Sequence, residues 1–237
     1  MSKEQEFEEE YEEVEVVEDD AISQIKKYGT IIVVALVVLL VGIYGFNYMS
    51  EQDEIKNNEA SKYLARVIPL VGEGDYEKAL EGDANIMIDN EPLMGLKEIE
   101  RKYSGTDAST LAAFFTGKAL LLQTKFDEAK PYFEKAIENE SKEVKIGAYS
   151  GLAACLEESG NFAEASKNYQ NASELVEQLE MKSKYLYFSA LTVEKAGNIE
   201  EAKKKYEKVV SLNIENAYSE YGGLSNASLN RIGTKID

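Results

Sequence analysis

Pairs of adjacent carboxylates are the side chains in this sequence most capable of chemistry. Glu157 and Glu158 are neighbours, as are Glu200 and Glu201, and two carboxylates held together can serve as a general acid and a general base. Both pairs fall in helical sequence, where adjacent side chains point in different directions. Neither pair is therefore predicted to form an acid–base couple.

Other residue types that catalysis and metal binding use are scarce. The 237 residues include no histidine, which excludes histidine-dependent triads and the usual zinc sites. The one cysteine, Cys155, lies in an alanine-rich helical context that is typical of a small core residue rather than a nucleophile. The sequence contains no glycine-rich phosphate loop. We expect no catalytic, cofactor or metal site and interpret the chain as a non-enzymatic protein.

Residues 28–50 contain no charged side chain and dominate the organisation of the chain. As a helix they would reach roughly 34 Å, enough to cross a hydrocarbon core of about 30 Å. Aromatic residues at both ends suit the headgroup layers. A buried core helix fits less well because the run is long, and a cleaved signal peptide fits less well because the preceding segment is acidic. We predict a transmembrane helix over residues 28–50, in contact with lipid.

The distribution of charge predicts what lies on each side of this span. The net charge is −18, which argues against binding to nucleic acid or adhesion to anionic lipid. Residues 1–27 are predicted to form an acidic, disordered cytoplasmic tail, with an acidic ligand for a basic partner as the functional alternative. Lys26 and Lys27 lie directly beside the span, which places the N-terminus inside and residues 51–237 outside the cytoplasmic membrane. The reverse orientation stays open, because an acidic tail can also be translocated.

Residues 51–237 show apolar residues at three- and four-residue intervals and little proline, which predicts helices, and no strand pattern is evident. Three segments repeat one another, residues 117–137, 153–173 and 190–210. Each combines small residues, a turn and two aromatic or branched positions around an alanine. Those alanines, Ala129, Ala165 and Ala202, are 36 and 37 residues apart. Helix pairs repeating at this spacing are typical of a solenoid.

The pattern resembles the tetratricopeptide repeat, a helix pair of 34 residues. The resemblance implies an all-α solenoid with three clear units, near residues 110–142, 146–180 and 183–215, and a capping helix over 217–232. A degenerate unit precedes them near residues 60–92. There Asp83 replaces an aromatic residue, and 50 residues separate Ala79 from Ala129, so additional structure is expected between the two units.

In tetratricopeptide arrays the first helix of each pair lines a concave face. The resemblance implies a partner-binding groove made of Leu111, Phe114, Phe115, Lys118, Leu121, Ser150, Ala154, Lys184, Tyr187, Phe188 and Leu191. Small residues in the middle unit and aromatics on both sides suit an extended or helical apolar segment. The alternative is that these aromatics only pack one helix pair on the next. The basic and asparagine cluster with which other members clamp a terminal carboxylate is not found here.

An acidic tail, a single span and an extracytoplasmic repeat domain together resemble the YfgM-like ancillary subunits of the bacterial Sec translocon. The resemblance implies a membrane-anchored, non-catalytic scaffold in the inner membrane, with its repeat domain in the periplasm. Its implied partners are translocon components, a periplasmic chaperone or nascent secreted chains. The alternative is a structural subunit of a larger envelope assembly with one fixed partner. The sequence leaves the partner's identity and the oligomeric state open.

Overall fold

The computed structural model describes residues 3–215 and 219–233, with no description of the side chains of residues 3–26, 30 and 32. The chain forms two compact units, residues 1–53 and residues 54–237. The predicted acidic tail falls largely on residues whose side chains lie outside this description, and its disorder stays a prediction.

The first helix, α1 (Lys3–Glu73), contains the uncharged stretch. It is the one helix among the described residues that is long and apolar enough to cross a membrane, by length and composition, with a mean hydropathy of 2.6 in its most apolar window. None of that window is buried by other parts of the described chain. Val41 and Phe46, for example, are 66% and 74% exposed.

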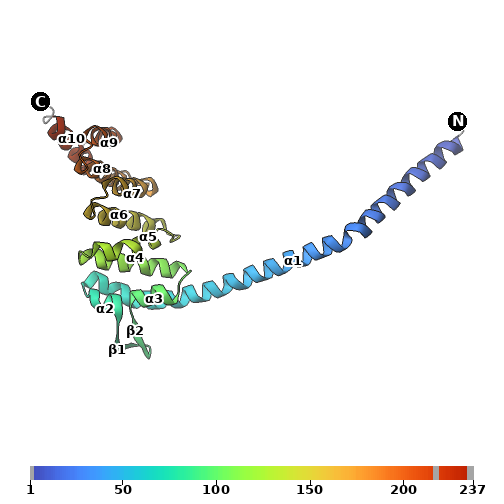
Figure 1. Cartoon of the computed structure of the whole chain (residues 1–237), viewed down its shortest axis with the longest axis horizontal. Helices are drawn as coiled ribbons and strands as arrows, with labels where there is room; N and C mark the ends of the chain where they lie inside the picture. Colours follow the sequence, from blue (N-terminus) through green and yellow to red (C-terminus); the bar gives the residue numbers. More distant parts are fainter. Residues whose placement is uncertain (1–2, 216–218, 234–237) are drawn as a thin grey trace. The chain divides into compact units, whose positions relative to one another are not determined.

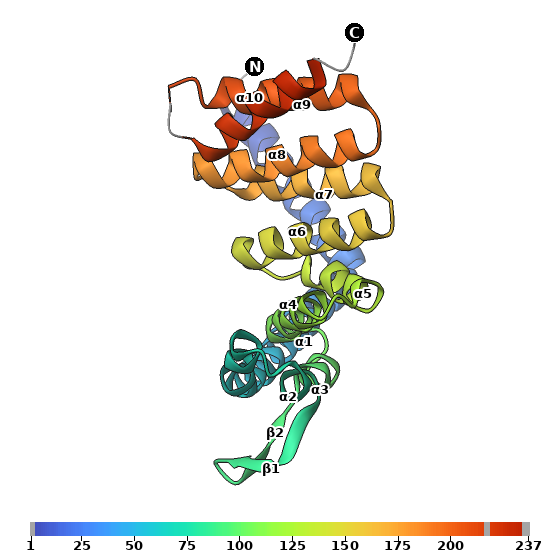
Figure 2. The ribbon, with the colours of Figure 1, turned by 90° about the vertical axis from the view of Figure 1, so that its left-hand side faces the viewer.

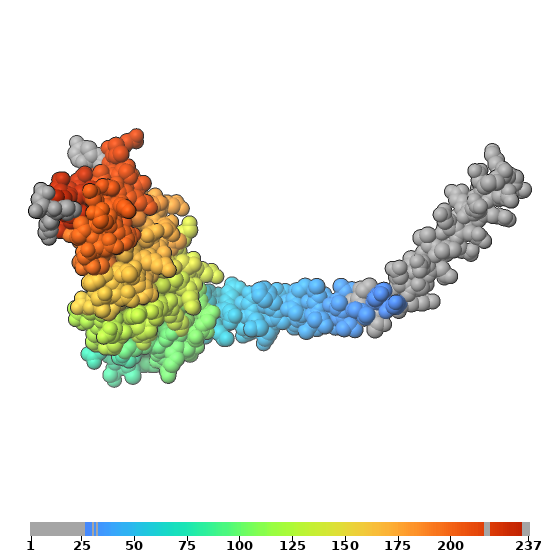
Figure 3. All heavy atoms as spheres, turned by 45° about the horizontal axis from the view of Figure 1, so that its top comes forward, coloured from blue at the N-terminus to red at the C-terminus, as the bar shows by residue number. Residues whose placement is uncertain are grey.

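Three helix pairs follow one another in the second unit. They are α4 (Asp107–Leu122) with α5 (Phe126–Ala136), α6 (Lys142–Glu158) with α7 (Phe162–Leu175), and α8 (Leu179–Lys195) with α9 (Ile199–Leu212). Each helix packs on the next in chain order, and α10 (Glu220–Gly233) packs on α8 and α9 at the end (Figures 1 and 2). In the space-filling view the second unit forms one continuous body, coloured from green through yellow to red (Figure 3). The predicted all-α solenoid is confirmed, and residues 217 and 218 of the predicted cap lie outside the described residues.

Small residues and turn residues set this stacking. Ala129, Ala165 and Ala202 are completely buried, which lets the two helices of each pair approach closely. Gly160 and Gly197 adopt left-handed backbone conformations, with φ of 75° and 83°, in the turns of the second and third pairs. In the first pair Thr124 takes this conformation, with φ of 59°. A β-branched residue is strained there.

A β-hairpin interrupts the degenerate first unit, so the sequence-based expectation of no strand is wrong at this point. The hairpin pairs β1 (Gly82–Ile88) with β2 (Glu91–Met94) in antiparallel register. It stands between the short helices α2 (Tyr76–Glu81) and α3 (Leu96–Lys102), as Figure 2 shows. The hairpin accounts for the long spacing between Ala79 and Ala129, because residues 82–95 are added to the second helix of the unit.

Close backbone contact holds the neck of the hairpin. A Cβ on Gly95 would lie 2.4 Å from the backbone of Glu81 and Gly82, and a Cβ on Gly82 would lie 2.3 Å from the carbonyl oxygen of Leu93. Only glycine fits at such distances. At the tip, Arg66 of α1 binds both Asp89, at 2.7 Å, and Glu91, at 3.2 Å. The two ends of the hairpin are thus in direct backbone contact, and ion pairs with Arg66 hold its tip against α1.

Candidate functional site

A hollow of about 340 Å³ lies across the first helices of the three pairs. Helix α4 contributes an aromatic wall, α6 a floor of small residues, and α8 a second aromatic wall. Its lining consists of Phe114, Lys118, Leu121, Phe133, Gly147, Ser150, Gly151, Ala154, Tyr169, Lys184, Tyr185 and Phe188. Its volume falls at the lower end of the range for ligand pockets, roughly 300–1,000 Å³.

Seven of the residues predicted from the sequence line this hollow, namely Phe114, Lys118, Leu121, Ser150, Ala154, Lys184 and Phe188. The other four, Leu111, Phe115, Tyr187 and Leu191, are not part of its lining. Phe115 packs edge-on against Phe114 with ring centroids 5.2 Å apart. Tyr187 contacts Tyr206 of α9 and Tyr221 of α10, with centroids 5.7 and 5.8 Å away. Tyr187 therefore joins the capping helix to the array.

Sequence reasoning missed three aromatic residues of the lining, Phe133, Tyr169 and Tyr185. Phe133 and Tyr169 stand at the second-helix aromatic position of their units, which the repeat pattern does reveal. That position packs towards the first helix of the next pair, so its ring can reach the concave side. The repeat pattern therefore contains the signal for both rings, although the same position also predicts packing between successive pairs.

Two positions in the floor of the hollow require glycine because aromatic rings pack directly against them. A Cβ on Gly147 would stand 2.6 Å from the Phe114 ring, and one on Gly151 would stand 2.4 Å from the Phe133 ring. Both glycines therefore serve packing between the first and second pairs. Ser150 and Ala154 are half-buried and remain as the open part of the floor.

Two lysines lie at the hollow, and no carboxylate lines it. The Lys118 ammonium is 5.9 Å from the centre of the Phe115 ring, and the Lys184 ammonium is 5.9 Å from that of Tyr185. Within the described residues neither lysine forms an ion pair. The hollow is thus apolar with positive charge beside it, in a protein whose net charge is −18.

A partly buried hydrogen-bond network holds Tyr169 of α7 in place at the hollow. The Tyr169 hydroxyl donates to Glu157 Oε2 at 3.1 Å, and Thr192 of α8 donates to Glu157 Oε1 at 2.7 Å. Lys195 adds an ion pair with Glu157 at 3.2 Å. Burial raises the pKa of the Tyr169 hydroxyl, which therefore stays protonated as a donor. Glu157, one of the paired carboxylates of the sequence, is committed to this structural role.

Groups that could act as nucleophiles are enclosed. Lys205 Nζ lies 3.1 Å from Ser189 Oγ, which is 2.8 Å from Ser166 Oγ, and desolvation lowers the pKa of Lys205. A lysine of this kind can activate a serine. Both serines are buried, however, and neither lines any of the hollows described here. Burial also raises the pKa of the Cys155 thiol to about 11, which favours its unreactive protonated form.

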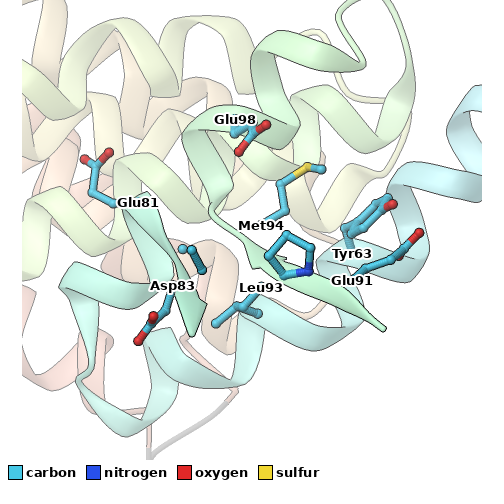
Figure 4. A pocket seen from close by; sticks show the side chains of 10 residues that line it. Tyr63, Glu81, Asp83, Glu91, Leu93, Met94 and Glu98 are labelled. Carbon is cyan, nitrogen blue, oxygen red and sulfur yellow. The ribbon is translucent and has the colours of Figure 1, made fainter. Parts of the chain in front are cut away.

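A second hollow, of about 400 Å³, lies at the neck of the hairpin. Carboxylates stand on several sides of Leu93 and Met94, as Figure 4 shows for Glu81, Asp83 and Glu98. One of these carboxylates, Glu81, is paired, because it accepts a hydrogen bond from Lys97 at 2.5 Å. No group of three metal-ligating side chains occurs in the described part of the chain.

Comparison with protein families identifies the family to which this helical array belongs. The chain belongs to the tetratricopeptide repeat-like domain family, whose model matches residues 24–211. The matched region includes both the apolar stretch of α1 and the residues of the hairpin. Domains of this kind generally mediate protein–protein interactions and are typically non-catalytic. No curated protein matches the chain.

Proposed function

We propose that this protein is a membrane-tethered, non-catalytic scaffold that captures a segment of a partner protein in the hollow between α4, α6 and α8. The observation that carries the proposal is the hollow itself, which has aromatic walls, an open floor at Ser150 and Ala154, and room for one or two large apolar side chains. Peptide grooves on helical scaffolds work in this way, with apolar anchors fixing an extended or helical segment.

The tether in this proposal is the apolar stretch over residues 28–50, set in the inner membrane of a bacterium with the N-terminus in the cytoplasm and the repeat domain in the periplasm. Its exposed apolar side chains and the lysine pair before it support the span and the orientation. Tethering confines scaffold and partner to one membrane and raises their effective concentration. A groove of modest affinity then suffices.

The partner class in this proposal is a translocon component, a periplasmic chaperone or a nascent secreted chain, so that the protein assists translocation or folding. The YfgM-like arrangement of tail, span and repeat domain supports this role. A shallow apolar hollow also suits short, sequence-tolerant contacts with segments that have not yet folded.

Site-specific crosslinking in intact membranes tests the proposal. A photoreactive phenylalanine analogue replaces Leu121, which lines the hollow, or its neighbour Leu122, which is 52% exposed and outside the lining. We expect partner crosslinks from position 121 and few from position 122. Equal crosslinking from both positions would count against the groove. Capture of one constant subunit would replace the proposal with a structural role.

Protease treatment of the same membranes tests the orientation. The repeat domain should resist protease added from the cytoplasmic side and become sensitive when the periplasmic side is opened. Digestion from the cytoplasmic side would invert the proposed topology and remove the periplasmic partners.

A blocking substitution separates binding from folding. Ala154→Trp fills the open floor, whereas Ala163→Trp places the same side chain at an exposed position on α7. Loss of crosslinks in the first variant and retention in the second are expected. Retention in both variants would show that the hollow does not hold the partner.

A further inference from the structure

The two lysines beside the hollow indicate which partner segments it would bind, if the hollow is the binding groove of the proposed function. We infer that the groove selects apolar segments flanked by acidic side chains, with Lys118 and Lys184 meeting the flanking carboxylates. This preference concerns internal segments of a partner and needs no free C-terminus.

The two lysines come from different repeat units and lie on either side of the small floor. Lys118 belongs to α4 and Lys184 to α8, while the floor residues Ser150 and Ala154 belong to α6 between them. A segment that anchors an apolar side chain over this floor would therefore extend towards a lysine on each side. The two charges are placed for the flanks of a ligand rather than for its centre.

Aromatic rings, not carboxylates, are the neighbours of these ammonium groups. Each ammonium is 5.9 Å from a ring centre, Lys118 from Phe115 and Lys184 from Tyr185. Such contacts leave the hydrogen-bonding capacity of the ammonium group free for a ligand. Some other lysines of the domain do form ion pairs, as Lys195 does with Glu157 and Lys135 does with Glu100. The charge beside the hollow is thus uncompensated by the lining.

The charge of the flanking residues should therefore determine which segments bind at the hollow. An acidic flank gains attraction to both lysines, whereas a basic flank meets like charge with no lining carboxylate to offset it. The acidic surface of the rest of the protein would repel acidic ligands in general. Acidic segments are therefore expected to bind at this hollow and poorly elsewhere on the domain.

Peptide binding to the full-length protein in lipid nanodiscs tests this inference. Three fluorescent peptides share a Leu-Leu-Phe centre and carry two glutamates, two glutamines or two lysines on each side. Fluorescence anisotropy should rank the glutamate peptide first, roughly tenfold tighter than the lysine peptide, as expected of two partly exposed charge pairs. The difference should shrink at high salt.

Charge reversal provides the matched control. The double variant Lys118→Glu and Lys184→Glu should reverse the ranking of the peptides. The double variant Lys203→Glu and Lys204→Glu makes the same change in net charge at exposed positions on α9 and should leave the ranking unchanged. Reversal in both variants would indicate a general charge effect and overturn the inference.

Two further outcomes separate this inference from the proposed function. If the three peptides bind equally and Ala154→Trp abolishes their binding, the groove stands and the acidic preference is wrong. If no peptide binds, or if Ala154→Trp leaves the binding unchanged, both the preference and the groove are wrong.

Discussion

The Tyr206 hydroxyl donates a hydrogen bond to Glu194 Oε2, 2.9 Å away and twelve residues earlier in the chain. Tyr169 and Glu157 make the same contact one unit earlier, at 3.1 Å, again twelve residues apart. Each bond joins the second helix of a pair to the end of its first helix. In the preceding unit the corresponding residues are Phe133 and Leu121, whose side chains cannot form this hydrogen bond, and both of them line the hollow.

Removing one such hydroxyl should destabilise the array. Tyr206 is completely buried, and Tyr206→Phe would delete a hydrogen bond to a charged acceptor, at a cost of about 1–2 kcal/mol in the free energy of unfolding. Urea unfolding of the detergent-solubilised protein, followed by circular dichroism, measures this cost. Tyr221→Phe is the control, because its hydroxyl has no hydrogen-bond partner among the described residues. Equal costs for the two variants would contradict the role given to Glu194.

Alkaline pH should weaken the domain through the same residues. Burial is the main cause that raises the pKa of Tyr103, Tyr169 and Tyr206 above the ordinary value of 10.0. The unfolded chain therefore loses these protons first, and stability, fully present below about pH 10, falls as the pH rises towards the folded-state values. Unfolding free energies measured between pH 8 and 11.5 should decline above pH 10, and less so in Tyr206→Phe. An identical slope in the variant would exclude Tyr206 as a contributor.

The strained turn of the first pair should be improvable. Thr124 holds a left-handed conformation, with φ of 59°, where the next two pairs have glycine. Thr124→Gly would relieve this strain and stabilise the protein by roughly 0.5–1 kcal/mol, after the entropic cost of glycine in the unfolded chain. The reciprocal change, Gly160→Thr, should destabilise it. A loss of stability in Thr124→Gly would show that the threonine side chain contributes more than its strain costs.

The sequence predicted the parts of the fold that depend on periodic positions. Buried alanines and second-helix aromatics recur at fixed spacing because each unit repeats the same packing. The repeat pattern indicated the helical repeats and seven of the twelve residues that line the hollow, whose role as a binding groove stays a prediction. Tyr187 does not line the hollow but packs against Tyr221 of α10, a contact that no repeat position encodes. Nonlocal partners of this kind are invisible to a periodic pattern.

The hairpin escaped prediction for a local reason. Its register shifts between Asp83 and Met87, so three residues of β1 have no partner and the alternation of exposed and buried side chains is broken. Pro92 lies within β2, and the turn uses Asp89 and Asn90, with φ of 54° and 65°, in place of a glycine. Short, irregular strands without a glycine turn lack the usual hairpin signals.

Substitution of the glycine at the neck of the hairpin tests how the hairpin is inserted between α2 and α3. Gly95→Ala would place a Cβ 2.4 Å from the backbone of Glu81 and Gly82, where no flexible side chain can move aside. We expect a loss of more than about 2 kcal/mol in stability, because the two ends of the interrupted helix would be forced apart. Gly72→Ala, in α1 with no heavy atom within 4 Å of the added Cβ, should be neutral or stabilising by up to about 1 kcal/mol. Urea unfolding of both variants measures the contrast. A small effect at Gly95 would mean that the hairpin is not held by close backbone contact and that α2 and α3 are not two halves of one helix.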